Sequence, residues 1–344
     1  MKNLIANDIT QALGNVPIIR LNKIHNICER QNLYLKLESC NPGGSIKDKN
    51  AAYLIKMAQA DGSLQKDGTI IESSSGNFGL GLAMVGAAYN YKVIIVVDAK
   101  TSPTIRKMLK AYGAQLVDVP LSEADANGSM QVARMNKAAS LAQEIPGSWY
   151  PCQHKNPNNP MAHFEWTARE IIDSFQGAPD VVIVGISTAG QVSGISKYFR
   201  NYYPSTKIIG VDVAGSVIFG TPPHPYKMTG LGLSFIPPNF HTDFVDGAYV
   251  IHDALAFSIC HLLAKQEGLL LGGSTGAIVA AGLHYAQQQE QKGLNILMVN
   301  PDNGDRYLDT IYNEEWLDKQ GITLTLKENL DEKISELSLI KEFI

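Results

Sequence analysis

Short apolar runs alternate along this chain with longer segments in which apolar residues recur at helical spacing. The runs consist mainly of Val, Ile and Leu, as in strands that are buried on both faces of a parallel sheet. The repeated strand–helix order predicts βα units and therefore an α/β fold. The expected strand–helix pairs are residues 32–38 with 49–60, 68–73 with 78–89, 91–98 with 103–113, 180–187 with 192–203 and 269–273 with 275–289, followed by strand 295–301, and a strand at 207–213.

A stretch rich in Pro and Asn divides these units into two series. It covers residues 147–160, GSWYPCQHKNPNNP, and this composition is typical of a domain boundary. We therefore expect a site where the two halves meet. A second stretch rich in Gly and Pro, residues 220–240, is expected to be a loop that borders the site.

Composition narrows the class of partner. The chain has 344 residues and a formal net charge of -4, without long basic or acidic runs. This balance gives no reason to expect nucleic acid or an anionic membrane as a partner, and favours a small molecule. The N-terminus lacks a long apolar segment, and no apolar run is long enough to span a bilayer, so we expect a cytoplasmic protein.

Cysteine and histidine spacing does not indicate a metal site. The four cysteines stand far apart, without a CxxC pair, and we expect reduced thiols that are mostly buried: Cys28, Cys40, Cys152 and Cys260. The eight histidines form no HxxxH or HExxH pair. No metal is predicted.

The loop NPGGSIKDK, residues 41–49, places Lys47 in the first turn of an expected helix. A cation there opposes the helix dipole, so stability alone would favour Asp or Glu. The same field disfavours the ammonium form, which would leave a neutral amine able to form an imine with an aldehyde cofactor. The alternative is a surface lysine beside a cap formed by Ser45 and Asp48.

The loop ESSSGNFG, residues 72–79, lies between another apolar strand and an apolar helix. Gly76, the serine hydroxyls and the amides of the helix start make a nest suited to a carboxylate. Asn77 adds an amide that could bind a pyridine-ring oxygen. Helix capping by Ser and Asn is the alternative.

Two later loops suggest a phosphate and a ring nitrogen as ligands. In GISTAGQVSG, residues 185–194, helix-start amides with Ser187 and Thr188 would bind phosphate without a basic residue. A dinucleotide loop is the rival, but the GxGxxG pattern is missing. In GGSTGA, residues 272–277, Ser274 could contact a pyridine nitrogen, or could simply cap the helix.

Taken in this order, the loops resemble the cysteine synthase and cystathionine β-synthase family of fold-type II pyridoxal-phosphate enzymes. The resemblance covers residues 8–318 and includes the late segment PDNGDRYL. It implies a tryptophan synthase β-like fold with two three-layer α/β/α domains, and a homodimer. The implied bounds are residues 13–34 and 40–153 for the smaller domain, 1–12, 35–39 and 154–320 for the larger, cofactor-binding domain, and 321–344 for a tail helix.

The resemblance also implies site roles. Lys47 would form the imine with pyridoxal 5'-phosphate and act as the proton-transfer base, Asn77 would contact the ring oxygen, and Ser274 the pyridine nitrogen. The phosphate would be held by Ser187, Thr188, Ala189, Gly190 and Gln191. The substrate would be bound by Ser74, Ser75, Gly76, Gln153, Gly230 and Gly232. Serine opposite the ring nitrogen would favour loss of a β-substituent over transamination.

Departures from ordinary cysteine synthases suggest which acceptor is used. Ser187 stands where those enzymes carry Gly, while Phe78, His154 and Gln191 replace other loop residues. Ser187 and the segment GSVIFG, residues 215–220, resemble the siderophore branch of N-(2-amino-2-carboxyethyl)-L-glutamate synthases. This branch converts O-phospho-L-serine through an aminoacrylate, adds the amino group of L-glutamate and releases phosphate, on the route to 2,3-diaminopropionate. Gln191 is expected to supply only its backbone amide.

Three other functions remain open on the sequence. The first is a cysteine synthase that adds sulfide to an aminoacrylate derived from O-acetylserine or O-phosphoserine. Glutamate, unlike sulfide, needs a polar or cationic anchor, and the sequence does not identify one. The others are a serine or threonine dehydratase, and a cofactor-binding regulatory protein without turnover.

Overall fold

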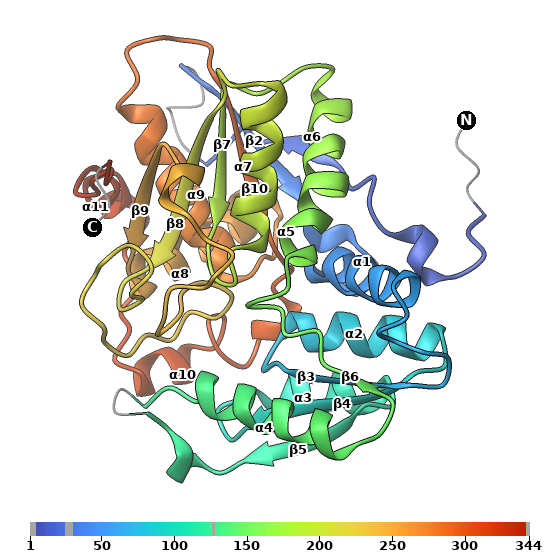
Figure 1. The fold of residues 1–344 in the computed structure, drawn as a ribbon. Coiled ribbons are helices and arrows are strands. Elements are labelled where there is room, and N and C mark those ends of the chain that lie inside the picture. Colours follow the sequence, from blue (N-terminus) through green and yellow to red (C-terminus); the bar gives the residue numbers. More distant parts are fainter. Residues whose placement is uncertain (1–4, 25–29, 126–127, 342–344) are drawn as a thin grey trace.

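The computed structural model of the chain describes residues 5–24, 30–125 and 128–341, and two sheets organise this part (Figure 1). The larger sheet has the strand order β1-β2-β10-β7-β8-β9, and only the edge strand β1 runs antiparallel to its neighbour. Its strands are β1 (Ile18–Arg20), β2 (Asn32–Leu37), β7 (Val181–Gly185), β8 (Lys207–Val213), β9 (Gly247–Ile251) and β10 (Asn295–Asn300).

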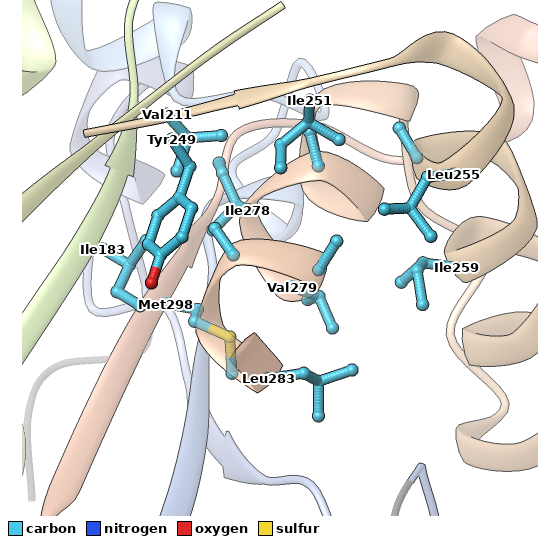
Figure 2. Packing of buried hydrophobic residues seen from close by; sticks show 14 of the residues in the cluster. Ile183, Val211, Tyr249, Ile251, Leu255, Ile259, Ile278, Val279, Leu283 and Met298 are labelled. Carbon is cyan, nitrogen blue, oxygen red and sulfur yellow. The ribbon is translucent and has the colours of Figure 1, made fainter. Parts of the chain in front are cut away.

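Helices cover both faces of the larger sheet. On one face, α9 (Gly273–Gln287) lies between the strands and α8 (Asp253–Glu267), and its side chains Ile278, Val279 and Leu283 fill the space between them (Figure 2). On the other face, α6 (Ala168–Phe175) and α7 (Gly190–Tyr202) pack on the alternate residues of the strands. A buried sheet with helices on both faces explains the continuous apolar runs of its strands.

The smaller sheet has the strand order β5-β4-β3-β6, and all its strands are parallel. They are β3 (Thr69–Ser73), β4 (Lys92–Asp98), β5 (Gln115–Val119) and β6 (Ser148–Trp149). One face is covered by α2 (Asn77–Ala88), on which α1 (Lys47–Ala60) packs in turn, and by α3 (Pro103–Ala111); the other is covered by α4 (Gln131–Glu144). The α/β fold expected from the apolar pattern is confirmed.

A short helix leads from the smaller sheet back to the larger one. It is α5 (Asn158–Ala162), which continues through the π-helical turn η5 (His163–Thr167) into α6. In Figure 1 this continuous green segment runs from the middle of the molecule to the top, beside α1 and α7. The remaining helices are α10 (Glu314–Lys319), α11 (Leu330–Ser335), and the 3-10 turns Ile9–Ala12, Glu38–Cys40, Leu121–Glu123, Thr242–Phe244, Asp305–Tyr307 and Lys327–Asn329.

The structure corrects where the first strands belong. Residues 18–20 and 32–34 were expected in the smaller domain, but β2 pairs with β10 from Asn32 onward and β1 pairs with β2, so both belong to the larger sheet. The apolar run of β2 cannot by itself show which of two parallel sheets it joins. The remaining domain bounds stay a prediction.

Two further expectations at the C-terminal end differ from the structure. Residues 269–273 form no strand; Leu271 makes a single bridge to Asn303, and α9 already begins at Gly273. Within the described residues 321–341, the tail is helical over the 3-10 turn Lys327–Asn329 and over α11, where Leu330 and Ile334 pack into the core, and it then extends so that Ile340 pairs with Ala248 of β9. Backbone pairing at a sheet edge carries no periodic signal that the short tail could show in advance.

The cysteines are less buried than expected. Cys260 is buried, Cys152 is half-buried, and Cys40 is exposed; all three are free thiols. Cys28 lies outside the described residues. The residues placed by the structure hold no cluster of three or more His, Cys, Asp or Glu side chains suited to a metal ion, and none of their helices has the length and apolar character needed to cross a membrane.

A buried ionic cluster fixes α1 against the larger sheet. Lys49 Nζ lies 2.9 Å from Glu38 Oε1 and 2.8 Å from Glu170 Oε2, and Lys36 Nζ lies 3.0 Å from the same Glu170 oxygen. The side chains of Lys36, Glu38 and Lys49 are fully buried. Charges removed from water in this way are retained only when they are paired. The cluster therefore anchors α1 two residues after Lys47, its first residue.

Candidate functional site

A cavity forms where the starts of α1, α2, α7 and α9 meet the ends of β7 and β10. The carboxyl ends of parallel strands are the usual place for ligands in α/β folds. The cavity is lined by Ile46, Lys47, Asn77, Gly185, Ser187, Thr188, Ala189, Gly190, Gln191, Gly230, Leu231, Ser274, Pro301 and Asp302. All eight residues predicted to bind the cofactor are among them.

Lys47 is the first residue of α1 and is half-buried in the cavity wall. Burial lowers the pKa of its ammonium group to about 8, while the negative charge of Asp302 opposes this shift. The direction agrees with the expectation from the sequence, but burial is its largest cause. Ser45 does accept a hydrogen bond from the Lys47 amide, at 3.3 Å, so the capping alternative is also present in the loop.

The loop from Ser187 to Gln191 has the backbone shape of an anion site. Ala189 adopts a left-handed conformation, with φ of 65°, directly before α7 begins at Gly190. Successive amides in such a turn at a helix start converge on an anion. Gly190 cannot be replaced here, because a Cβ atom would lie 1.9 Å from Asn159 Oδ1.

Gln191 provides a direct test of whether a phosphate group fits. Its side chain is 6% exposed, and its Nε2 atom is buried without a hydrogen-bond partner. An unpaired buried amide donor is costly, and an acceptor placed in the cavity would remove that cost. The phosphate group therefore fits the residues present, and the free side-chain amide goes beyond the backbone contact expected from the sequence.

Ser274 and Gly230 face each other across the cavity. Ser274 is buried in the first turn of α9, and a Cβ atom at Gly230 would lie 3.6 Å from its Oγ atom. Gly230 has a φ of 89°, a conformation that favours glycine. The region predicted as a loop bordering the site thus contributes Gly230 and Leu231 to the cavity.

Asn77 takes part in a network that sequence reasoning missed. Its Nδ2 donates to Asp302 Oδ2 at 2.7 Å, and its Oδ1 accepts from Arg306. Asp302 also accepts from the Tyr307 hydroxyl, and Arg306 donates to the carbonyl of Gly43. The segment PDNGDRYL was noted in the sequence, and its position directly after the last strand of the larger sheet was the signal available.

Five predicted substrate residues do not line the cavity: Ser74, Ser75, Gly76, Gln153 and Gly232. The loop that carries the first three follows β3, and Ser74 Oγ accepts from the amides of Gly76 and Gly79 at 3.3 and 2.9 Å. Ser74 thus caps α2 in this structure. Their role in binding the substrate stays a prediction.

Glu72 connects this loop to Gln153. Its carboxylate is fully buried and accepts from the Ser73 amide at 2.8 Å with one oxygen, and from the Gln153 amide at 3.3 Å with the other. Burial raises the pKa of Glu72 to about 8 although these amides lower it. Glu72 thus lies beneath the loop that follows β3 and holds it to the segment that contains Gln153. Its buried carboxylate fixes these two predicted substrate segments relative to each other.

Two further polar residues, His154 and Arg134, lie near the predicted substrate residue Gln153. The His154 ring packs against Phe235, and its buried Nδ1 has no hydrogen-bond partner. Burial, with the positive charges of Lys47 and Arg134, lowers the pKa of His154 to about 4. Arg134 forms an ion pair with Asp98, which leaves its own buried Nε unpaired.

The geometry defines a class of protein: an α/β protein with a half-buried lysine, a loop shaped to bind an anion and a buried serine around one cavity. These parts suit pyridoxal 5'-phosphate, which supplies an aldehyde for amines and an electron sink for bonds to the amino-acid α-carbon. Residues 9–302 match the family described as "Pyridoxal-phosphate dependent enzyme". The chain belongs to this family and is a pyridoxal-phosphate enzyme.

The relatives of this chain are named as several different synthases. The chain is 35% identical over 316 residues to the N-(2-amino-2-carboxyethyl)-L-glutamate synthase of Cupriavidus metallidurans, covering 91% of this chain and 92% of that one. It is 36% identical to the cysteine synthase of Helicobacter pylori, covering 89% and 98%. The structure of an O-acetylserine dependent cystathionine beta-synthase from Helicobacter pylori is similar, with a TM-score of 0.83, 34% identity, and coverage of 90% and 100%. The chain is therefore similar to synthases that share a cofactor and differ in what they add.

Proposed function

We propose that this enzyme replaces the phosphate of O-phospho-L-serine with the amino group of L-glutamate. The products would be N-(2-amino-2-carboxyethyl)-L-glutamate and inorganic phosphate. Support comes from the glutamate synthase relative, which is similar over nine-tenths of the chain, and from Ser187, which lies in the cavity wall where cysteine synthases carry glycine. The reaction is a β-replacement, as in the named relatives.

The single observation that carries the choice of acceptor is the Arg134 guanidinium, whose buried Nε has no hydrogen-bond partner and whose positive charge acts on His154. O-phosphoserine and glutamate bring phosphate and carboxylate groups, and a guanidinium binds both. Sulfide and the uncharged acetyl ester of O-acetylserine need no such cation. Arg134 is thus the anchor that the sequence alone did not identify, and Asp98 holds it in place.

Each predicted residue has a role in this reaction. Lys47 would bind the cofactor and take the proton from the substrate α-carbon, because a buried amine with a lowered pKa is a competent base. Asn77 and Ser274 would bind the ring oxygen and the ring nitrogen, and residues 187–191 the cofactor phosphate. The substrate carboxylate would be bound by Ser74, Ser75, Gly76 and Gln153, with Gly230 and Gly232 in the adjoining loop.

Cysteine synthase is the second candidate, favoured by the cysteine synthase relative at 36% identity. The test is to incubate the purified enzyme with O-phospho-L-serine or O-acetyl-L-serine, each with either glutamate or sulfide, and to identify products by mass. The proposal expects the glutamate adduct from O-phospho-L-serine. Cysteine formed in preference to that adduct would contradict it.

We also infer a cytoplasmic homodimer on the pathway to 2,3-diaminopropionate and siderophores, which the resemblance implies. Light scattering on the purified enzyme should give twice the chain mass. A monomer would contradict the dimer and would leave the proposed reaction untouched.

A further inference from the structure

The side-chain amide of Asn77 is held from both ends by the segment that follows β10. Asp302 Oδ2 accepts from Nδ2 at 2.7 Å, and Arg306 donates to Oδ1. A carboxylate can only accept and a guanidinium can only donate. The two contacts therefore fix which end of the amide is nitrogen, and a flip would set two donors and two acceptors against each other.

Burial of Asp302 and Arg306 makes rotation of the Asn77 amide costly. Asp302 is 2% exposed and Arg306 is 4% exposed. Tyr307 donates a second hydrogen bond to the Asp302 oxygen that Asn77 uses, and Arg306 also donates to the carbonyl of Gly43, in the loop that carries Lys47. Gly44 preserves this contact, because a Cβ atom there would lie 2.7 Å from an Arg306 nitrogen. Rotation of the amide would leave buried polar groups unpaired.

One N–H of the Asn77 side-chain amide has no partner in this network. Nδ2 carries two hydrogens, and Asp302 takes one of them. Asn77 lines the cavity together with Lys47, Ser274 and the phosphate loop. The second hydrogen is the donor available to a ligand there.

We propose that Asp302 and Arg306 are positioning residues that lock the Asn77 amide with its free N–H toward the cofactor's ring oxygen. This assignment rests on the proposed contact between Asn77 and that oxygen. The two residues come from the larger-sheet side of the cavity, whereas Asn77 begins a helix on the smaller sheet. The same contacts thus join the two sheets at the cofactor site.

The test is a double-mutant cycle with Asn77→Ala and Arg306→Met, read out by equilibrium dialysis of the holoenzyme and by its visible absorption band. Each single variant should weaken cofactor binding about tenfold, since Asn77→Ala removes and Arg306→Met misdirects the proposed hydrogen bond from Asn77 to the charged ring oxygen. The double variant should be no weaker than Asn77→Ala alone, because Arg306 acts through Asn77. The band should shift alike in all three.

Asp305→Asn is the matched control. Asp305 is exposed and lies in the same segment, so its loss should leave cofactor binding and the band unchanged. If Arg306→Met unfolds, Arg306→Lys replaces it in the cycle. Lysine keeps the positive charge, but its single nitrogen cannot donate to Asn77 and to the Gly43 carbonyl in the geometry of the guanidinium. Additive losses, about a hundredfold in the double variant, would overturn the proposal.

Failure of the proposed reaction would look different. An enzyme that binds its cofactor normally but makes cysteine instead of the glutamate adduct contradicts the acceptor assignment and leaves the cycle interpretable. A cycle in which Asn77→Ala alone has no effect on the band or on binding contradicts the positioning proposal, whatever the acceptor.

Discussion

Lys47 and Glu72 are ionisable residues that the fold keeps away from water, one in the cavity wall and one beneath the neighbouring loop. Burial lowers the pKa of Lys47 to about 8 and raises that of Glu72 to about 8. In both cases burial favours the uncharged form. In the role proposed for Lys47, the neutral amine would be the reactive species, which gives a direct pH prediction.

Cofactor uptake by the cofactor-free enzyme should speed up as pH rises through about 8, because the neutral Lys47 amine attacks the aldehyde. Three ionisable groups lie near this amine: Asp302, and the two histidines His154 and His163, whose pKa values are lowered by burial and by the Lys47 charge. Asp302 is the acidic one and raises the lysine pKa, so Asp302→Asn should move the midpoint to lower pH. The growth of the visible band after mixing with the cofactor, measured across pH, tests the pH dependence and the effect of Asp302→Asn. An unchanged or higher midpoint in Asp302→Asn would contradict the role given to Asp302.

Glu72→Gln should weaken binding of the amino-acid substrate, because the new amide nitrogen faces the Gln153 or Ser73 N–H instead of accepting from it. The loss of one such buried contact predicts a rise in KM for O-phospho-L-serine of about tenfold, with little change in kcat. Steady-state kinetics measure this. Glu123→Gln, at an exposed turn, serves as the control; an equal fall in kcat would indicate general disruption of the site.

Ser187→Gly should alter the choice of acceptor more than it alters cofactor binding. Ser187 lines the cavity, and its hydroxyl makes only a long contact, 3.4 Å, with the Gly232 carbonyl. We expect the ratio of kcat/KM for glutamate to that for sulfide to fall about tenfold, as for loss of one hydrogen bond. Equal losses in cofactor binding and in both acceptor reactions would refute this.

At the scale of elements, four helices begin at the cavity, and the sequence predicted the loops before each of them. Their glycines, serines and strand–helix context are local, so a single stretch contains the whole signal. Asp302, Arg306 and Glu72 were not recognised, because their partners are supplied by segments remote in the chain or by backbone amides. The expected strand at 269–273 shows the converse: an apolar run can be an irregular connection, in which Leu271 is buried but Leu270 is exposed.

The buried ionic cluster on α1 gives a stability prediction. Lys49→Met should lower the free energy of unfolding by about 3 kcal/mol, because Glu38 loses its closest cation and Lys36 alone remains for two carboxylates. Urea denaturation measures the change. Lys56→Met on the exposed face of the same helix should change it by less than about 0.5 kcal/mol. Similar effects of the two variants would contradict the account of the cluster.

On the scale of the whole molecule, the site lies between two sheets that the chain builds in an interleaved order. The first strands, β1 and β2, belong to the larger sheet, the chain then forms the smaller one, and it returns through α5 and α6 (Figure 1). Apolar patterns predicted two parallel sheets. They did not show that β1 and β2 join the larger sheet, since the pairing partners of parallel strands are set by tertiary packing. The interleaving brings Lys47 and Asp302 to one cavity.

The central claim is that Lys47 carries the cofactor in this cavity. Treating the enzyme with sodium borohydride makes the cofactor–lysine bond permanent, and peptide mass mapping then identifies the modified residue. We predict that the added mass lies on the peptide that contains Lys47, and that Lys47→Ala abolishes it. The added mass on another lysine, or its persistence in Lys47→Ala, would contradict the account.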